Sequence, residues 1–230
     1  MEDEAGVLPV SGYVLAGGRS SRMGADKAGL MFGERSLVEV AVEKLAGICA
    51  EVAIAGNRED LEHVAPIVTE TRFFVGPGAG IEAGLRHAHN EWCLFVPVDV
   101  PLLPVALLRR WAADVLEAGK RGLRGSYLTA NGRAQPSICM FHRECLDSVV
   151  RSLNRGERRV KFLLDGVDFD LGAGTLAVKD VAAYAAASGA TAEDVRRWFS
   201  NLNTPEEFAE AERLWARQRG ASGEGRGVRD

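Results

Sequence analysis

A short apolar run that ends in a glycine-rich, basic loop most constrains the fold of this chain. Residues 12–16 read Gly-Tyr-Val-Leu-Ala, and the overlapping segment 15–27 contains three glycines, two arginines and a lysine. Glycine lets the backbone approach a ligand closely, and successive backbone N–H groups in such a loop form an anion-binding nest. Loops that a strand positions commonly carry function. The segment therefore predicts a strand that delivers a phosphate-binding loop.

Charged side chains in the same loop support this interpretation. Arg19 and Arg22 offer planar forks for phosphate oxygens, and Lys27 offers a compact positive charge. Gly17 and Gly18 open the loop to close approach. The alternative is an ordinary solvated turn whose basic residues only face water. We expect Arg22 and Lys27 to be catalytic, phosphate-binding residues.

Strand and helix patterns alternate through the first half of the chain. Strands are expected at residues 12–16, 51–55, 66–69 and 92–96, and helices at 37–45, 59–64, 79–89 and from 104 onward. Ser36 and Glu39 have the spacing of a capping box at the start of the first helix. This order predicts an α/β fold with three layers and a doubly wound, mainly parallel sheet. The loops that follow the strands then share one edge of the sheet.

The second half is less regular. Asn131-Gly132 predicts a hairpin between strands at 125–129 and 134–141, and helices are expected at 146–153 and from Thr204 onward. Residues 171–197 include the alanine-rich, helix-prone segment 181–187. Two interpretations of residues 171–197 are open: an elaboration on the surface of the domain, or a contact with a partner. Residues 218–230 contain four glycines and are expected to form a disordered tail.

Asp99 is the strongest single candidate for a functional side chain. It lies in Val96-Pro-Val-Asp-Val-Pro101, at the end of the strand predicted at 92–96. Open α/β sheets bind ligands beyond the carboxyl ends of their strands. A carboxylate there can hold Mg²⁺ together with phosphate oxygens and water. The alternative is a turn carboxylate that caps the helix beginning near Pro104.

The glycine-rich stretch Gly76-Pro-Gly-Ala-Gly80 permits a rival hypothesis. Gly78, Gly80 and Gly84 open a helix, and Asp99 lies nineteen residues after Gly80, close to the spacing of a dinucleotide-binding fingerprint. An NAD-dependent oxidoreductase is therefore an alternative function. It is disfavoured because the strand before Gly76 would be very short, Pro77 stiffens the turn, and the loop at 15–27 would have no role.

Composition excludes several classes of protein. The 230 residues are 47% hydrophobic and 26% charged with a net charge of −4, which favours neither nucleic acid nor an anionic membrane as partner. The four cysteines form no C-x-x-C pair, which indicates a reducing compartment. The four histidines show no metal-ligand grouping and are expected at the surface. We expect a cytoplasmic protein, since the first ten residues are acidic and no apolar run is long enough to span a membrane.

The loop at 15–27, continued by Ala28, Leu30 and Gly33, resembles the N-terminal signature of nucleotidyltransferases with a Rossmann-like fold. It is most similar to molybdenum cofactor guanylyltransferases, in which a strand leads into LAGG, SxRMG and DK. The R-G-E-R-R-V stretch at 155–160 and the N-x-N-T-P-E element at 201–206 resemble the same family. The resemblance reaches from about residue 12 to residue 208, and the P-loop pattern occurs nowhere in the chain.

The resemblance implies a single nucleotidyltransferase domain at residues 1–217, with a nucleotide-binding half at about 12–103 and an acceptor-binding half at about 104–217. It implies transfer of GMP from GTP to the phosphate of molybdopterin, with pyrophosphate as the leaving group. Asp99 lies in the family's D-x-P context and would bind Mg²⁺, or Mn²⁺ in its place. A cytidylyltransferase, or a nucleotidyltransferase with another small acceptor, remains an alternative.

The resemblance also implies a set of nucleotide-binding residues: Leu15, Ala16, Gly17, Gly18, Lys27, Asn57, Glu70, Gly76, Pro77, Gly80 and Asp99. Two positions depart from the family, since Ala55 stands where relatives commonly carry asparagine and Glu70 where they carry aspartate. The family places the pterin near Gln135-Pro136 and the element at 201–204. Transient contact with cofactor-delivery proteins or apo-molybdoenzymes is a further expectation.

Overall fold

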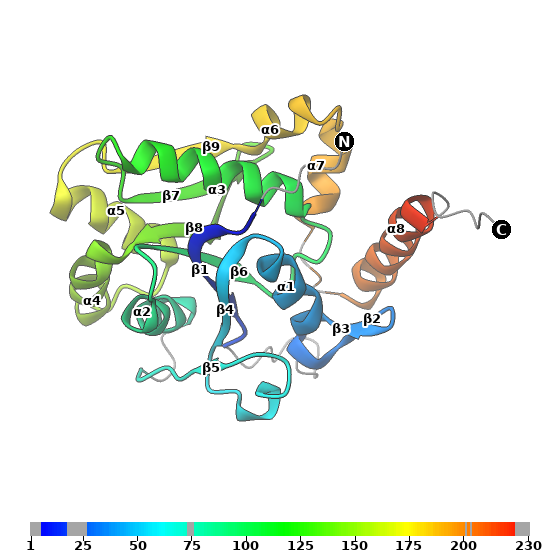
Figure 1. The fold of residues 1–230 in the computed structure, drawn as a ribbon, viewed down its shortest axis with the longest axis horizontal. Helices are drawn as coiled ribbons and strands as arrows, with labels where there is room; N and C mark the ends of the chain where they lie inside the picture. Colours follow the sequence, from blue (N-terminus) through cyan, green and yellow to red (C-terminus); the bar gives the residue numbers. More distant parts are fainter. Residues whose placement is uncertain (1–5, 18–26, 73–75, 201, 203, 224–230) are drawn as a thin grey trace.

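The computed structural model describes residues 6–17, 27–72, 76–200, 202 and 204–223; the side chains of residues 205 and 216–223 are also outside the description. A seven-stranded sheet forms the centre of the molecule, in the order β5-β4-β1-β6-β8-β7-β9 (Figure 1). Its strands are β1 (Leu8–Leu15), β4 (Cys49–Ala55), β5 (Ile67–Val68), β6 (Trp92–Pro97), β7 (Gly125–Ala130), β8 (Arg133–His142) and β9 (Leu176–Asp180). Only β8 runs antiparallel to its neighbours among these strands, so the sheet is mainly parallel, as the sequence predicts.

Helices cover both faces of the sheet. One face carries α1 (Leu37–Ala46), α3 (Val105–Gly119), α6 (Val181–Ala187) and α7 (Ala192–Trp198), and the other carries α2 (Pro77–His87), α4 (Leu146–Asn154) and α5 (Val160–Leu171). Side chains of β1 alternate between two cores, because Val10 and Val14 join the first and Tyr13 and Leu15 join the second. The three-layer prediction is confirmed.

Smaller elements complete the described chain. A hairpin of β2 (Met31–Phe32) and β3 (Arg35–Ser36) packs against the C-terminal helix α8 (Pro205–Gly223), with the Phe32 ring 5.6 Å from that of Phe208. Short 3-10 turns occupy Lys27–Gly29, Glu59–Leu61 and Arg143–Cys145.

Local sequence signals predict several boundaries correctly. Ser36 and Glu39 form the capping box of α1, with each side chain bonded to the other residue's backbone N–H. Asn131 and Gly132 both have positive φ, 51° and 71°, in the turn between β7 and β8. The helix expected at 59–64 is only a single 3-10 turn.

Residues 171–197 correct one expectation. This segment is not a surface elaboration, because β9 pairs in parallel with β7 as an edge strand of the central sheet. The helix expected at 181–187 is present as α6, and Val181 and Ala185 are buried in the core on that face. The C-terminal helix α8 continues to Gly223, past residue 218, where the sequence predicts the start of a disordered tail; residues 224–230 lie outside the described chain.

Candidate functional site

The candidate site lies where four parallel strands end. The register of the sheet aligns the last residues of β1, β4, β5 and β6, which are Leu15, Ala55, Val68 and Pro97. Two residues beyond each of these positions the chain carries, in turn, Gly17, Asn57, Glu70 and Asp99. Four of the predicted site residues therefore leave the same edge of the sheet at the same level, which is where open α/β sheets bind ligands.

Lys27 and Asp99 form an ion pair at this edge. The Nζ atom of Lys27 lies 3.6 Å from Oδ2 of Asp99, and the side chains are 14% and 26% exposed. Lys27 begins the 3-10 turn that follows the glycine-rich loop, whereas Asp99 follows β6, so the pair joins two distant parts of the chain. The structure thus brings together the two charged residues that the sequence singles out.

Glu70 lies against the glycines of the site. A Cβ atom added at Gly17 would meet Oε1 of Glu70 at 2.5 Å, and one added at Gly80 would meet the same oxygen at 3.2 Å. The backbone N–H of Glu70 donates to Oδ1 of Asn57 over 3.0 Å. Partial burial raises the pKa of the Glu70 carboxyl group above its usual value. In the sequence, Glu70 is a candidate only because of the resemblance to the family. Nothing in the sequence predicts that its carboxylate lies close to the backbones of Gly17 and Gly80.

The amino end of α2 forms another wall of the site. Gly76 has φ of +73°, a left-handed conformation that glycine tolerates, and Pro77 takes the first helical position. A Cβ atom at Gly76 would lie 3.9 Å from the carbonyl oxygen of Arg158, which places the R-G-E-R-R-V stretch beside this loop. The sequence alone gave no indication of that neighbour.

The other glycines of α2 have packing roles. A Cβ atom at Gly78 would come within 2.9 Å of Leu153 Cδ2, and one at Gly84 within 2.7 Å of Phe95 Cε1. Both glycines therefore let α2 pack closely on α4 and on the sheet. Close packing thus accounts for Gly78 and Gly84 without a dinucleotide, which weakens the case for an oxidoreductase.

Some predicted residues cannot be placed. Gly18, Arg19 and Arg22 fall in residues 18–26, and Asn201 and Asn203 are likewise outside the described residues. Gln135 and Pro136 are described, and they lie near the amino end of β8. Because β8 runs antiparallel to β6, pairing Phe95 with Cys139, this end of β8 points toward the edge that carries Asp99.

The chemistry of Asp99 fits a magnesium ion that is shared with a nucleotide. Within the described part of the chain, no three His, Cys, Asp or Glu residues are grouped as metal ligands. Mg²⁺ in nucleotide sites keeps several waters and binds through one or two carboxylates plus phosphate oxygens. A single carboxylate beside Lys27 suits that arrangement, whereas an ion held by protein ligands alone would need more donors.

The cysteines and His142 lie outside the candidate site and are buried in the protein interior. All four cysteines are free and buried, and burial raises the pKa values of Cys49 and Cys145 to about 12. His142 is buried against Trp92, contrary to the expected surface location, and burial lowers its pKa. No helix among the described residues is long and apolar enough to cross a membrane.

Comparison with known proteins shows the family to which the chain is similar. Residues 12–168 match the model of the MobA-like NTP transferase domain. The chain is 35% identical over 161 residues to a molybdenum cofactor guanylyltransferase of Serratia proteamaculans, covering 68% of this chain and 79% of that protein. A molybdenum cofactor guanylyltransferase of Yersinia pestis is 32% identical over 164 residues, covering 69% of this chain and 82% of that protein.

A solved structure shares the fold. The molybdopterin-guanine dinucleotide biosynthesis protein A of Archaeoglobus fulgidus superposes with a TM-score of 0.70 at 21% identity, covering 90% of this chain and 99% of that one. The similarity supports the three-layer architecture over nearly the whole chain.

Proposed function

The chain belongs to the MobA-like NTP transferase family, and from this premise we propose that it transfers GMP from GTP to the phosphate of molybdopterin. The observation that carries the proposal is the Lys27–Asp99 ion pair at the carboxyl edge of the sheet, where the neighbouring strand β1 leads into Gly17 at the same level. Paired opposite charges at this position suit a polyphosphate with a divalent cation.

The transfer step needs orientation and charge neutralisation more than a protein nucleophile. An oxygen of the acceptor phosphate forms a bond to the α-phosphorus of GTP, and the bond from that phosphorus to the β-phosphate bridging oxygen breaks. Pyrophosphate leaves with the electron pair. Lys27 would neutralise charge on the triphosphate, and Arg22 would add a second cation; the latter lies outside the described residues.

Asp99 would hold Mg²⁺, or Mn²⁺ in its place. The ion, when bound, supplies positive charge that offsets the negative charge of the phosphates. The ion pair between Lys27 and Asp99 holds both groups at the sheet edge, where each can meet a ligand of opposite charge.

Several groups would bind the nucleoside. The base and ribose would be approached by three groups: the backbones of Leu15, Ala16, Gly17 and Gly18, the amino end of α2 at Gly76, Pro77 and Gly80, and the side chains of Asn57 and Glu70. A carboxylate at Glu70 can accept from the N1–H and the N2 amine of guanine, which lie side by side on the base. A site built on such hydrogen bonds rejects a base that leaves them unpaired.

The acceptor side is proposed from the same premise. Gln135, Pro136 and the element at 201–204 would line the pterin pocket, since β8 brings its amino end toward the site edge. The dinucleotide product then passes to its users, which we propose are cofactor-delivery proteins or apo-molybdoenzymes met in transient contact. Four unpaired thiols suit a cytoplasmic location.

Competition between nucleotides tests the proposal. Purified protein is given molybdopterin, Mg²⁺ and an equimolar mixture of GTP and CTP, and the two dinucleotide products are quantified. We expect kcat/KM for GTP to exceed that for CTP by at least about 100-fold. A higher value for CTP would assign the chain to cytidylyl transfer, and no transfer with either nucleotide would overturn the proposal. ATP and UTP serve as controls for unspecific triphosphate use.

A further inference from the structure

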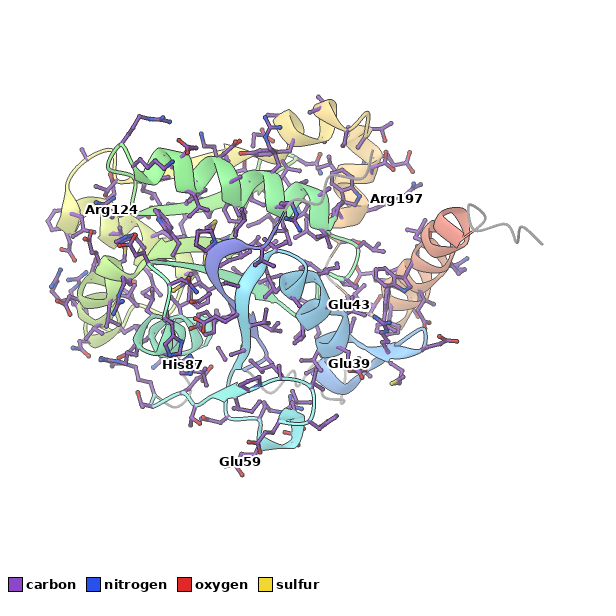
Figure 2. All side chains as sticks on the ribbon, viewed as in Figure 1. Glu39, Glu43, Glu59, His87, Arg124 and Arg197 are labelled. Carbon is purple, nitrogen blue, oxygen red and sulfur yellow. The ribbon has the colours of Figure 1, made fainter. Side chains whose placement is uncertain are left out.

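A lysine of α1 has its ammonium group buried against the chain that follows Asp99. Lys44 is 7% exposed, and its Nζ atom donates to the carbonyl oxygen of Val100 over 3.2 Å and also to that of Pro101. Both acceptors are within two residues of Asp99 and are themselves buried. Figure 2 labels the preceding residue, Glu43, on the side of α1 that faces α8.

No carboxylate forms an ion pair with Lys44 among the described residues, although Glu43 lines the cavity beside it. Glu43 pairs with Arg35 instead, on the exposed side of α1. The Nζ atom lies 5.9 Å from the ring centroid of Trp215 in α8, next to a cavity of about 550 Å³ that Val40 and Trp198 also line. Burial lowers the pKa of Lys44 to about 7.

Filling this space with a lysine is energetically unfavourable compared with filling it with an apolar side chain. Burying an ammonium group is unfavourable unless its hydrogen bonds are made, and an apolar side chain of the same length would pack on α1 without that cost. The carbonyl groups explain why an amine is present, because buried carbonyl oxygens require donors: Lys44 supplies one to Pro101 and a second one to Val100, which also accepts from the backbone N–H of Leu103. A neutral amine still carries two N–H groups, so both bonds persist on either side of its pKa.

We propose that Lys44 is a positioning residue, which fixes the turn after β6 so that Asp99 stays beside Lys27 in the geometry that binds the metal–nucleotide pair. The turn has two further supports among the described residues: Leu103 donates its backbone N–H to the carbonyl oxygen of Val100 over 3.2 Å, and the side chains of Val100 and Leu103 are buried in the core. Lys44 is the side chain that bonds directly to the carbonyl groups of Val100 and Pro101. Lys44 acts on the backbone that carries the carboxylate and touches neither substrate nor Asp99. This inference rests on the proposed function, since it concerns the group to which that function assigns the metal.

Two variants separate positioning from packing. Lys44→Met keeps the length of the side chain and removes the donors. Val40→Ala is the matched control, because Val40 is on the same helix, is 1% exposed and lines the same cavity without bonding to the turn. Lys44→Gln, which keeps a shorter N–H donor, is the second variant in case the methionine protein does not fold.

Amide hydrogen exchange and metal titration are the measurements. In Lys44→Met we expect exchange in residues 98–103 to rise about tenfold and the Mg²⁺ concentration for half-maximal GTP binding to rise about tenfold, with kcat falling more than KM changes. Lys44→Gln should show smaller changes in the same direction. Val40→Ala should lower the melting temperature and leave both quantities as in the wild type.

The measurements distinguish failure of this inference about Lys44 from failure of the proposed function. If Lys44→Met, or Lys44→Gln in its place, matches Val40→Ala in exchange and Mg²⁺ dependence, Lys44 only fills space and the inference is overturned. If the wild-type protein transfers no guanylyl group, the proposed function fails, and exchange in residues 98–103 still decides whether Lys44 holds the turn.

Discussion

Gly17→Ala should impair nucleotide binding by displacing Glu70. A Cβ atom at Gly17 would lie 2.5 Å from Oε1 of Glu70, far inside van der Waals contact, so one of the two must move. The atom that it meets is the end of a flexible side chain, and Gly17 is absent from the described glycines with positive φ. Alanine therefore adds no backbone strain, and the carboxylate yields rather than the fold.

The size of the effect follows from what Glu70 would lose. A hydrogen bond to a charged group contributes roughly 1.5–3 kcal/mol, which corresponds to a loss of GTP affinity of about 10- to 100-fold. Stability should change little, because Glu70 is only half-buried and can move its carboxylate toward solvent. The expected signature is weak binding in a protein that unfolds like the wild type.

A double-mutant cycle tests this reasoning. GTP affinity is measured by calorimetry for the wild type, Gly17→Ala, Glu70→Ala and the double variant. If the methyl group acts through Glu70, Gly17→Ala in the Glu70→Ala background costs less than about threefold, because the colliding side chain is gone. An equal loss in both backgrounds would mean that the methyl group obstructs the nucleotide directly, and the assigned link between Gly17 and Glu70 would be refuted.

Three further predictions concern the charged residues of the site. Asp99→Asn should abolish transfer in a protein with unchanged circular dichroism, and single-turnover activity within about threefold of the wild type would contradict the metal role. Lys27→Ala should weaken GTP binding by roughly 2 kcal/mol, about thirtyfold, as measured by calorimetry; unchanged affinity would contradict a phosphate contact. Burial raises the pKa of Glu70, so its contribution to stability is complete at low pH and is lost as the pH rises through that pKa. Glu70→Gln should therefore gain stability relative to the wild type at pH 7 more than at pH 4 in urea titrations, and a constant difference would contradict the burial argument.

The chemistry of the site was more predictable than its geometry. Lys27 and Asp99 stand out because each follows a recognisable strand pattern and suits phosphate or metal. Their 3.6 Å separation depends on how the chain returns after the glycine-rich loop, for which no local signal exists. Glu70 was harder still, since the strand before it has only two residues, Ile67 and Val68, and such a strand leaves little pattern to align.

The edge strand β9 was not predictable from the sequence, for a physical reason. The strand β9 is five residues long, lies at the edge of the sheet and is half exposed, so its sequence lacks the continuous apolar run of a central strand. Its partner β7 is about fifty residues earlier in the chain, and such non-local pairing is invisible to periodicity. The helix α6 was predicted correctly because alanine favours helix locally, while its burial through Val181 depends on the strand that precedes it.

The antiparallel strand β8 lets the second half of the chain contribute residues to the same edge of the sheet as the first half. Open parallel sheets bind ligands beyond the carboxyl ends of their strands, and β1, β4, β5 and β6 bring the proposed nucleotide-binding residues to that edge. A further parallel strand would add its carboxyl end to the same crowded edge. An antiparallel strand offers its amino end instead. The register of β8 with β7 shifts between the pairs Tyr127–Cys139 and Leu128–Gln135, so residues 136–138 form an irregularity in β8. On the proposed function, the acceptor would reach the α-phosphate from the side of β8, so the attacking oxygen and the leaving pyrophosphate would not compete for the same side of the site.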